Sequence, residues 1–470
     1  MADFAAPTPL TGPIAPSHRA ELGALLRLAT PLVGANLLQM GVYAIDVVFV
    51  ARLTPLDLAA STLGVFLYSL MLWMMLGLAT ACAPLIAAEL GRRRHAVREV
   101  RRSFRMAMWL AALVSLPIMI LLANGTTILL FARQDPEVAR RAGAFLDILL
   151  FAMVPAIFAG VMRTAAAALG RPGWALGVTA MALGLGALGN WLLVFGHGGF
   201  PALGLEGSAI ASVATTMAMM IAYGLILSFD PRLRRYRLFG RWWRPEWSRL
   251  AEIVKLGVPI AFTFVLEGAL FGGAALLMGR IGVAAIAAHA VALNIAALTF
   301  QIPLGVAQAA TIRVGMAYGA RDRDAVGRAG RVALGVGIGI MAFTALLIFS
   351  LPRLFVSIYL DVDAPANTVV VALALQYLIV AAIFQLVDGA QAVAAGVLRG
   401  VQDTRVPMLI AAFGYWVAGF GTSIYLGFQV GWQGVGIWIG LAVGLLVVSA
   451  LLLWRWRARE RLGLLRWATA

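Results

Sequence analysis

The sequence predicts an all-α integral membrane protein with twelve transmembrane helices. Hydrophobic residues make up 62% of the 470 positions and charged residues only 12%, which is far from the balance of a soluble domain. The apolar runs are about 20 residues or longer, enough to cross a bilayer as a helix, whereas a barrel would show alternating segments of about ten residues. The predicted spans begin near Leu22, Leu56, Phe104, Ala142, Trp174, Leu203, Leu250, Val283, Val332, Asn367, Val406 and Trp432.

The amino-terminal segment before Leu22 has no apolar core and no processing site, so we expect the first span to remain as an anchor. The lone cysteine, Cys82, lies inside the second predicted span. It has no partner for a disulfide, which also excludes a cysteine metal site, and we interpret it as a small core residue.

The formal charge of +16 comes from arginines in the short links between spans. The links after the even-numbered spans, together with the carboxy-terminal segment, hold 27 arginines, against 6 in the opposite links. The positive-inside rule therefore predicts that both termini are cytoplasmic, in the inner membrane of a cell. We interpret the basic runs as anchors beside anionic lipid, which excludes nucleic acid as the favoured partner.

An internal repeat divides the chain into two halves. An offset of 228 aligns Pro31 with Pro259 and Gly91 with Gly319, and "GLEGSAI" (204–210) matches "GWQGVGI" (431–437). Because each half has six spans, both enter the membrane from the same face, so we expect a pseudo-two-fold axis along the membrane normal. The predicted organisation is an N-lobe of spans 1–6 (1–231), a basic cytoplasmic linker (232–249) and a C-lobe of spans 7–12 (250–470).

Four acids fall within or at the edge of the spans: Asp46, Asp147, Glu267 and Asp388. An ionised acid at the bilayer centre costs about 2.5 to 3.5 kcal/mol on insertion scales, so the central acids should face protein or a watery cavity. Asp147 lies near the outer end of its span, where water or the neighbouring Arg140 and Arg141 can satisfy its carboxylate, so a structural role is favoured. Glu267 and Asp388 have no nearby basic residue within their spans, which favours a functional role.

Other polar residues in the spans recur at helical spacing, which puts them on common faces. The stripes are Asn36, Gln39, Tyr43 and Asp46; Asn294, Gln301 and Gln308; and Gln385, Asp388 and Gln391, with Thr263 one turn before Glu267. A cavity between the two six-helix lobes is the expected common target, and helix-to-helix hydrogen bonding is the alternative for the amides. His289 is equally consistent with a packed, hydrogen-bonded core residue.

Catalytic motifs are missing from the sequence: there is no GxSxG, HExxH or Walker A pattern, and only four histidines. No link is long enough for a nucleotide-binding domain. We therefore predict that the protein is not an enzyme, that it has no cofactor, and that an ion gradient drives whatever it moves.

Four motifs together resemble the multidrug and toxic compound extrusion (MATE) family, in its NorM-like branch. They are "IDVVFVARLTPLDLAA" (45–60), "AAHAVALN" (287–294), "PLGVAQAATIRVG" (303–315) and "VDGAQAVAAGVLRGVQD" (387–403). The resemblance extends over all twelve spans. It implies a cation-coupled antiporter that exports amphipathic, often cationic, small-molecule drugs.

The resemblance also implies roles for particular residues. Glu267 and Asp388 match the C-lobe acids that bind the coupling Na⁺ or H⁺, and Asp46 matches the N-lobe acid. Asn190 and Ser212 fall where relatives place N-lobe oxygen ligands for the cation. Relatives often have a second polar residue at the position of Gly186, so this chain departs from a complete N-lobe sodium shell. No metal is expected beyond Na⁺ at Glu267 and Asp388.

We expect antiport because an inorganic cation and a cationic drug compete for the same buried charge. Pliable apolar residues can wall the cavity for dissimilar drugs, although such residues are also common in cores. The predicted substrate cavity comprises Asn36, Gln39, Met40, Tyr43, Thr263, Phe264, Phe271, His289, Asn294, Gln301, Gln385 and Gln391. We expect a monomer in contact with membrane lipids.

Three alternatives stay open at this point. A lipid-linked oligosaccharide flippase of the same superfamily would need several interior basic residues, and only Arg163 and Arg313 qualify; we interpret them as cytoplasm-side snorkelling or lobe-end pairing. An intramembrane enzyme could use Asp46 and Asp388 as paired acids. A passive channel would show currents far faster than exchange.

Overall fold

The computed structural model describes residues 17–92, 96–465 and 467, and these residues form twelve helical segments long and apolar enough to cross a membrane. The prediction of an all-α membrane protein with twelve spans is therefore confirmed. The segments are His18–Val50, Pro55–Arg92, Val97–Ala123, Pro136–Ala168, Gly173–Phe195, Gly204–Phe229, Trp247–Ile281, Val283–Gly319, Arg323–Ser350, Pro365–Gly400, Arg405–Gln429 and Gln433–Arg457.

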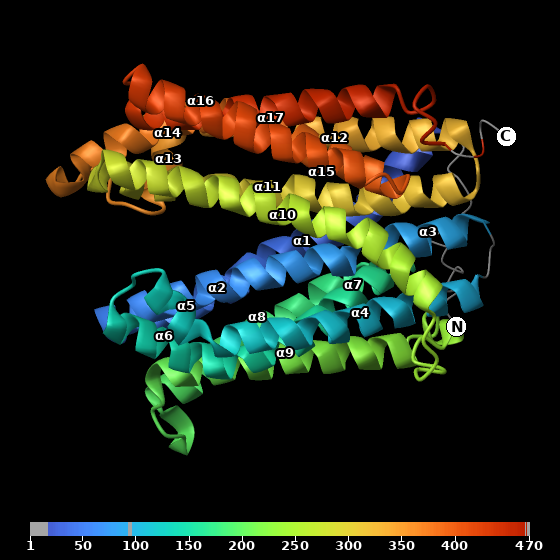
Figure 1. Ribbon diagram of the computed structural model, residues 1–470, viewed down its shortest axis with the longest axis horizontal. Coiled ribbons are helices and arrows are strands. Elements are labelled where there is room, and N and C mark those ends of the chain that lie inside the picture. The colour runs from blue at the N-terminus through green and yellow to red at the C-terminus, as the bar shows by residue number, and fades with distance from the viewer. Residues whose placement is uncertain (1–16, 93–95, 466, 468–470) are drawn as a thin grey trace, which may run out of the picture. The chain divides into compact units, whose positions relative to one another are not determined.

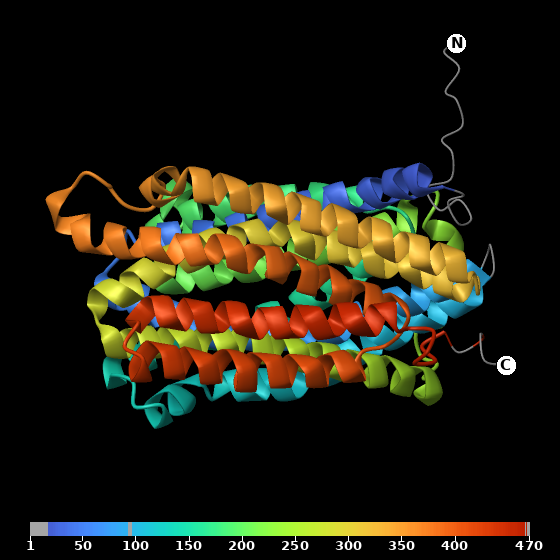
Figure 2. The same cartoon turned by 90° about the horizontal axis from the view of Figure 1, so that it is seen from above.

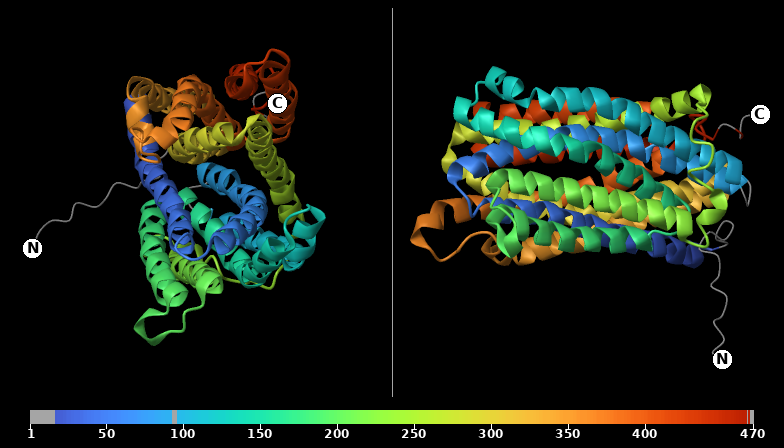
Figure 3. Two further views of the ribbon diagram at one scale, coloured as in Figure 1. Left: turned by 90° about the vertical axis from the view of Figure 1, so that its left-hand side faces the viewer. Right: turned by 90° about the horizontal axis from the view of Figure 1, so that it is seen from below.

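The chain divides into two compact units, one of which contains Gly34–Ala261. The other contains the residues from Phe262 onwards, together with the part of the first helix that precedes Gly34. The helices α1 (His18–Val50) and α10 (Trp247–Ile281) therefore each contribute residues to both units. Figure 3 shows the helices of each unit end-on.

The first unit is a bundle of antiparallel helices (Figure 1). In it, α9 packs against α8 and α7, and α2 packs against α6 and α7. Its helices after α1 are α2 (Pro55–Thr80), α3 (Cys82–Arg92), α4 (Val97–Ala123), α5 (Gly125–Phe131), α6 (Pro136–Leu149), η1 (Leu150–Ala152), α7 (Met153–Ala168), α8 (Gly173–Phe195), η2 (His197–Gly199), α9 (Gly204–Phe229) and η3 (Arg234–Tyr236).

The second unit is built around α14, which packs against α11, α12 and α17. Figure 2 shows these long helices running side by side. Its helices after α10 are α11 (Val283–Gly319), α12 (Arg323–Ser350), α13 (Pro352–Ser357), η4 (Pro365–Asn367), α14 (Thr368–Gly400), α15 (Arg405–Ala412), η5 (Phe413–Phe420), α16 (Gly421–Ile424), η6 (Tyr425–Gln429) and α17 (Gln433–Arg457).

Several helices begin where the sequence supplies a cap. The Thr54 side chain accepts a hydrogen bond from the backbone N–H of Asp57, and Pro55 occupies the first turn of α2. Asp135 caps α6 in the same way, and Asp322 caps α12. A side-chain oxygen at this position satisfies an N–H that has no partner inside the helix, which fixes where the helix starts.

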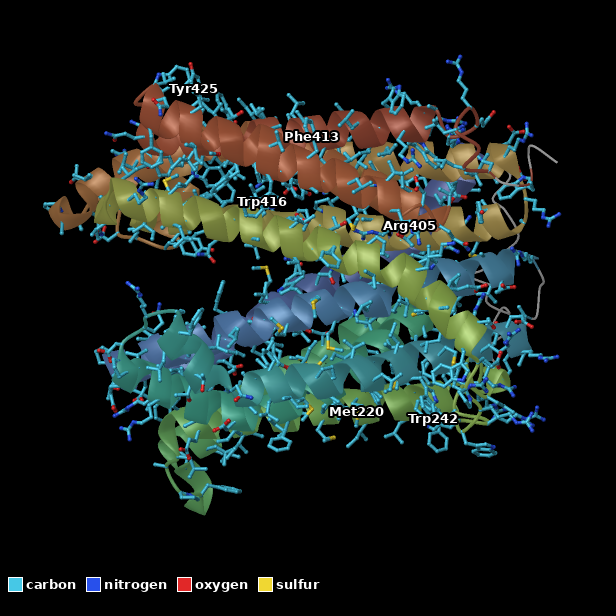
Figure 4. The ribbon with its side chains drawn as sticks, viewed as in Figure 1. Met220, Trp242, Arg405, Phe413, Trp416 and Tyr425 are labelled. Atoms are coloured by element: carbon cyan, nitrogen blue, oxygen red, sulfur yellow. The ribbon has the colours of Figure 1, made fainter. Side chains whose placement is uncertain are left out.

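The eleventh span departs from α-helical geometry. Residues Phe413–Phe420 and Tyr425–Gln429 form π-helix on either side of the short α16. Arg405, Phe413, Trp416 and Tyr425 mark the course of this span in Figure 4. The hydrophobic pattern of the sequence does not distinguish a π-helix from an α-helix. The span was therefore predicted near Val406, but its π-helical geometry was not.

The predicted linker 232–249 is held against α4 by hydrogen bonds to its backbone carbonyls. Arg101 Nε donates to the Tyr236 carbonyl and Trp109 Nε1 donates to the Trp242 carbonyl, each at 3.1 Å. Figure 4 labels Trp242 in this linker. The segment between α9 and α10 therefore lies fixed on its own unit.

Candidate functional site

A cavity of about 200 Å³ lies inside the first unit, enclosed by α1, α2, α6, α7, α8 and α9. The stripe on α1 faces it, because Gln39, Tyr43 and Asp46 all line it. The other polar lining residues are Ser61, Tyr68, Ser69, Arg163, Ser208, Ser212, Thr215, Thr216 and Tyr223. The spacing of three and four residues on α1 thus places its polar groups on one wall of an internal space.

Three of the predicted residues meet at this cavity. Asn190 Nδ2 donates a hydrogen bond to Asp46 Oδ1, and Ser212 Oγ donates to Asp46 Oδ2, both at 2.8 Å. The resemblance implied Asn190 and Ser212 as oxygen ligands of a cation, but here both act as donors to the carboxylate. Donors of this kind favour the ionised form of a buried acid. Asn190 Oδ1 is buried and has no hydrogen-bond partner among the described residues, so one oxygen stays free to accept.

The cavity also holds a basic residue, Arg163. Its guanidinium donates a hydrogen bond to Asn36 Oδ1. The interpretation of Arg163 as a cytoplasm-side snorkelling residue is therefore wrong, because its side chain turns into the bundle. Asn36 precedes Asp46 by ten residues on α1, so Arg163 contacts the stripe at a different level of the helix from Asp46.

Two of the other predicted acids, Glu267 and Asp388, lie in the second unit, and Glu267 on α10 is half-buried there. The Arg399 guanidinium lies over the ring of Phe264, 5.2 Å from its centroid. Phe264 is three residues before Glu267 and so shares its helix face, and Glu267 interacts electrostatically with both Arg399 and Asp388. The structure thus brings together the two acids that the sequence singled out and adds an arginine that it did not.

Asp388 and Gln391 lie one turn apart on α14, and both are buried. Gln391 Nε2 donates a hydrogen bond of 2.6 Å to Tyr415 Oη on η5. Asp388 Oδ1 and Gln391 Oε1 have no hydrogen-bond partner among the described residues. A buried oxygen without a donor is costly, and two such oxygens from one turn of helix are ligands that a proton or a hard monovalent cation can satisfy.

The two sites differ in formal charge. The cavity in the first unit carries one acid and one base, Asp46 and Arg163. The cluster in the second unit carries two acids and one base, Glu267, Asp388 and Arg399. With every group ionised, the first is neutral and the second has a net charge of −1. The second cluster therefore has the greater need of a cation from outside the chain.

The remaining predicted cavity residues take several positions. Asn294 Nδ2 and Gln301 Nε2 donate to carbonyls of their own helix, at 2.8 and 3.1 Å, and Gln385 hydrogen-bonds Thr299. These amides therefore satisfy helix backbone or a neighbouring helix. Met40 is half-buried on α1, and Thr263 is buried in α10.

Aromatic packing surrounds the second cluster. The Phe271 ring meets Phe384 at 6.1 Å between centroids, and Phe384 meets Trp438 at 5.7 Å. His289 is 1% exposed and its ring lies 5.5 Å from that of Trp438. His289 is therefore packed in the core, but its ring nitrogens have no hydrogen-bond partner among the described residues, so only the packed part of that interpretation fits.

Two of the charged residues that the sequence analysis singled out, Asp147 and Arg313, lie away from these sites. Asp147 is exposed on α6. Arg313 donates two hydrogen bonds to Glu21, as the predicted lobe-end pairing requires. Sequence reasoning missed Arg399, Tyr415 and the position of Arg163 at the cavity. Arg399 follows Asp388 by eleven residues, or three helical turns, and this spacing was the one indication that the two share a helix face.

Twelve membrane-spanning helices, a polar cavity and a buried acidic cluster are the features of a multi-pass membrane transporter. The MatE family profile matches residues 31–192 and 259–424. The chain is 46% identical over 445 residues to the "Probable multidrug resistance protein NorM" of Mesorhizobium japonicum, covering 95% of each chain. It is also 46% identical to the protein of the same name from Brucella suis, covering 93% of each.

Solved structures share the fold. The crystal structure of the eukaryotic MATE transporter AtDTX14 superposes with a TM-score of 0.85 at 22% identity, covering 96% of this chain and 98% of that one. The chain therefore belongs to the MatE family. The predicted resemblance is confirmed, and so is the prediction that the protein is not an enzyme, because these relatives are transporters.

Proposed function

We propose that this protein is a cation-coupled multidrug antiporter that exports amphipathic, often cationic, organic compounds. The relatives named above are multidrug resistance proteins, which supports the substrate class. The observation that carries the coupling is the second-unit cluster, where two acids and one arginine leave a net charge of −1 and two buried oxygens lack donors. Such a cluster is stabilised when an inorganic cation enters it.

The proposed cycle uses this charge as the point of competition. A proton or Na⁺ neutralises Glu267 and Asp388, and an organic cation is bound when they are ionised. One-for-one exchange of a monovalent cation for a singly charged drug moves no net charge, so the concentration gradient of H⁺ or Na⁺ drives it. When one net charge enters per cycle, as in exchange for a neutral drug, 100 mV adds about 2.3 kcal/mol, equivalent to a roughly fiftyfold gradient. The oxygens of Asp388 and Gln391 can bind either cation, so we propose either H⁺ or Na⁺ as the coupling ion.

The cavity of the first unit is a second proposed contact site for the drug, in addition to the ionised cluster where the drug competes with the inorganic cation. Tyr43, Tyr68 and Tyr223 offer broad, partly apolar faces, and Asp46 offers a negative charge. This supports amphipathic cations as substrates. A lipid-linked oligosaccharide flippase receives less support, because this cavity holds one arginine and an acid rather than several bases.

The arginine distribution supports cytoplasmic termini, and the relatives' bacterial origin supports an inner-membrane location. In this orientation, drug enters from the cytoplasm and leaves outward.

The test uses purified protein in proteoliposomes with an imposed pH or Na⁺ gradient and a fluorescent organic cation. Glu267→Gln and Asp388→Asn should each abolish gradient-driven transport while leaving the protein folded. Asp147→Asn is the matched control, because it makes the same change in an exposed acid of another span and should transport normally. Full coupling in both test variants would overturn the proposal.

A further inference from the structure

A second cavity, of about 320 Å³, lies at one end of the second unit. It is bounded by the turn between α10 and α11, by the early part of α14 and by the start of α17. Figures 1 and 2 both show these three segments at the same end of the unit. None of Glu267, Asp388 and Arg399 lines it, so it is distinct from the cluster that they form.

Two long helices begin at this cavity without a side-chain cap. The first backbone hydrogen bond of α11 is donated by Ile286 to the Gly282 carbonyl, so the N–H groups of residues 283–285 precede it. The first of α17 is donated by Gly436 to the Trp432 carbonyl, so the N–H groups of 434 and 435 precede it. All five of these residues line the cavity. Uncapped amides carry the positive end of each helix dipole.

A tyrosine that is almost wholly buried lines the same space. Tyr377 lines the cavity, yet the residue is only 1% exposed, and its Oη forms no hydrogen bond with any described residue. The hydroxyl lies directly against the first turn of α17, because a Cβ placed on Gly434 would be 1.9 Å from Oη. The ring is held by Trp438, with 6.5 Å between centroids. A fixed O–H at the cavity wall, with no acceptor among the described residues, can donate to a ligand that accepts hydrogen bonds.

The charge of the surroundings selects the ligand. Among the described residues no Asp, Glu, Lys or Arg lines the cavity, and the side-chain donors that do are the neutral groups of Gln376, Tyr377, Trp432 and Gln433. The nearest charge along the chain is Arg280, next to the lining residue Ile281, with its guanidinium 5.2 Å from the Phe428 ring centroid. Two helix amino termini and neutral donors favour an anion, and the lack of a lining base favours a single negative charge over a dianion.

We propose that this cavity is a binding site for one small monovalent anion, either a halide ion from solution or the phosphodiester of a lipid headgroup. The anion accepts hydrogen bonds from the first-turn amides of α11 and α17 and from Tyr377 Oη. It ties together three helix ends that have no covalent link at this point. The inference stands independently of the proposed coupling, because none of its residues belongs to the acidic cluster.

The test measures thermal unfolding of the purified full-length protein at constant Na⁺, with gluconate replaced stepwise by chloride or by dimethyl phosphate. A bound anion stabilises the folded state by mass action, so the unfolding temperature should rise and saturate with its concentration. Chloride protection identifies a halide site, and protection by dimethyl phosphate alone identifies a headgroup site. If neither anion changes the unfolding temperature of the natural protein, the site does not exist.

Gln433→Glu places a carboxylate inside the cavity, where it should occupy the site and lower the apparent anion affinity at least tenfold. Gln429→Glu is the matched control, because Gln429 is exposed at the same end of the unit and does not line the cavity. It should keep the affinity of the natural protein. Val283→Pro removes one amide donor at a helix position that proline tolerates, and should weaken binding severalfold. Equal anion affinity in Gln433→Glu and Gln429→Glu would overturn the assignment.

Discussion

Glu21 and Arg313 form a buried two-point ion pair within the second unit. Arg313 Nε donates to Glu21 Oε1 at 2.8 Å and Nη2 donates to Oε2 at 2.6 Å. The two residues are 3% and 6% exposed. The pair joins the first turns of α1 to the far end of α11, two segments separated by 292 positions in the chain.

Removing one partner of this pair should destabilise the fold strongly. Glu21→Gln leaves a buried guanidinium without its counter-charge, which costs about 3 to 5 kcal/mol in comparable pairs. The double variant Glu21→Leu with Arg313→Met should recover most of that loss, since it leaves no unpaired charge. Unfolding of the detergent-solubilised protein, followed by tryptophan fluorescence, measures both. Additive losses in the double variant would contradict this account of the pair.

Arg399 should set the cation affinity of the acidic cluster. Arg399→Gln changes the formal charge of the cluster from −1 to −2, so less of the coupling cation should be needed for half-maximal transport, by severalfold. Arg399→Lys keeps the charge and should stay close to the natural protein. The measurement is transport rate against Na⁺ concentration or pH in proteoliposomes. An unchanged cation dependence in Arg399→Gln would show that the guanidinium does not act on the acids.

Asn190 should stabilise the protein through the charge of Asp46. Its amide donates to Asp46 Oδ1 at 2.8 Å, and hydrogen bonds to charged groups contribute about 1.5 to 3 kcal/mol. Asn190→Ala should therefore cost stability of this order, and the cost should fall when Asp46→Asn is already present. The comparison is a double-mutant cycle of unfolding free energies. If Asn190→Ala costs the same in both backgrounds, the two side chains are not coupled.

A carboxylate outside the membrane spans should make stability depend on pH. Asp230 follows α9 and accepts hydrogen bonds from Arg171 Nε and Trp174 Nε1, each at 2.9 Å. Burial acts to raise the pKa of Asp230, but these hydrogen bonds and the Arg171 charge together lower it from the ordinary value of 3.8. A lowered pKa stabilises the fold fully above the unfolded-state value, and this stabilisation is lost as pH falls through the folded-state value.

Asp230→Asn should accordingly lower the unfolding temperature by a constant amount at neutral pH. The gap between the variant and the natural protein should narrow below pH 3.8. Unfolding temperatures measured from pH 3 to 7 test this, with Asp147→Asn as a control that lacks an ion pair in the described structure. A gap that stays constant down to pH 3 would mean that the ionised carboxylate contributes nothing.

The sequence predicted the spans well, because apolar length and the spacing of polar residues are local properties. The stripe of Gln39, Tyr43 and Asp46 lies on one cavity wall, as its spacing required. The residues that these polar groups contact on other helices were harder to predict. The positive-inside rule already accounted for Arg399, and Arg163 was interpreted as a snorkelling residue. Apart from the spacing of Arg399 from Asp388, nothing in the sequence marked their inward direction.

Other parts of the molecule depend on contacts that no single segment encodes. Asn294 and Gln301 repeat every seven residues, but each satisfies its own helix backbone. The uncapped starts of α11 and α17 converge with Tyr377 only through tertiary packing. The π-helical geometry of Phe413–Phe420 likewise follows from packing against α17.

Close helix packing in the second unit gives the last prediction. A Cβ on Gly396 of α14 would lie 2.5 Å from the Ala307 carbonyl oxygen and 2.9 Å from its Cα, on α11. Because those atoms are backbone, the helices themselves must separate to admit a methyl group. Gly396→Ala should therefore destabilise the protein by about 1 to 3 kcal/mol, the usual range for overpacking.

Gly339→Ala on α12 is the matched control, because nothing lies within 4 Å of its added Cβ and the residue is exposed. It should be neutral, or stabilising by up to about 1 kcal/mol, since alanine favours the helix over glycine. Unfolding midpoints of the two variants in the same detergent separate packing from helix propensity. Equal shifts in the two would mean that α11 and α14 are not in the close contact that the structure gives them.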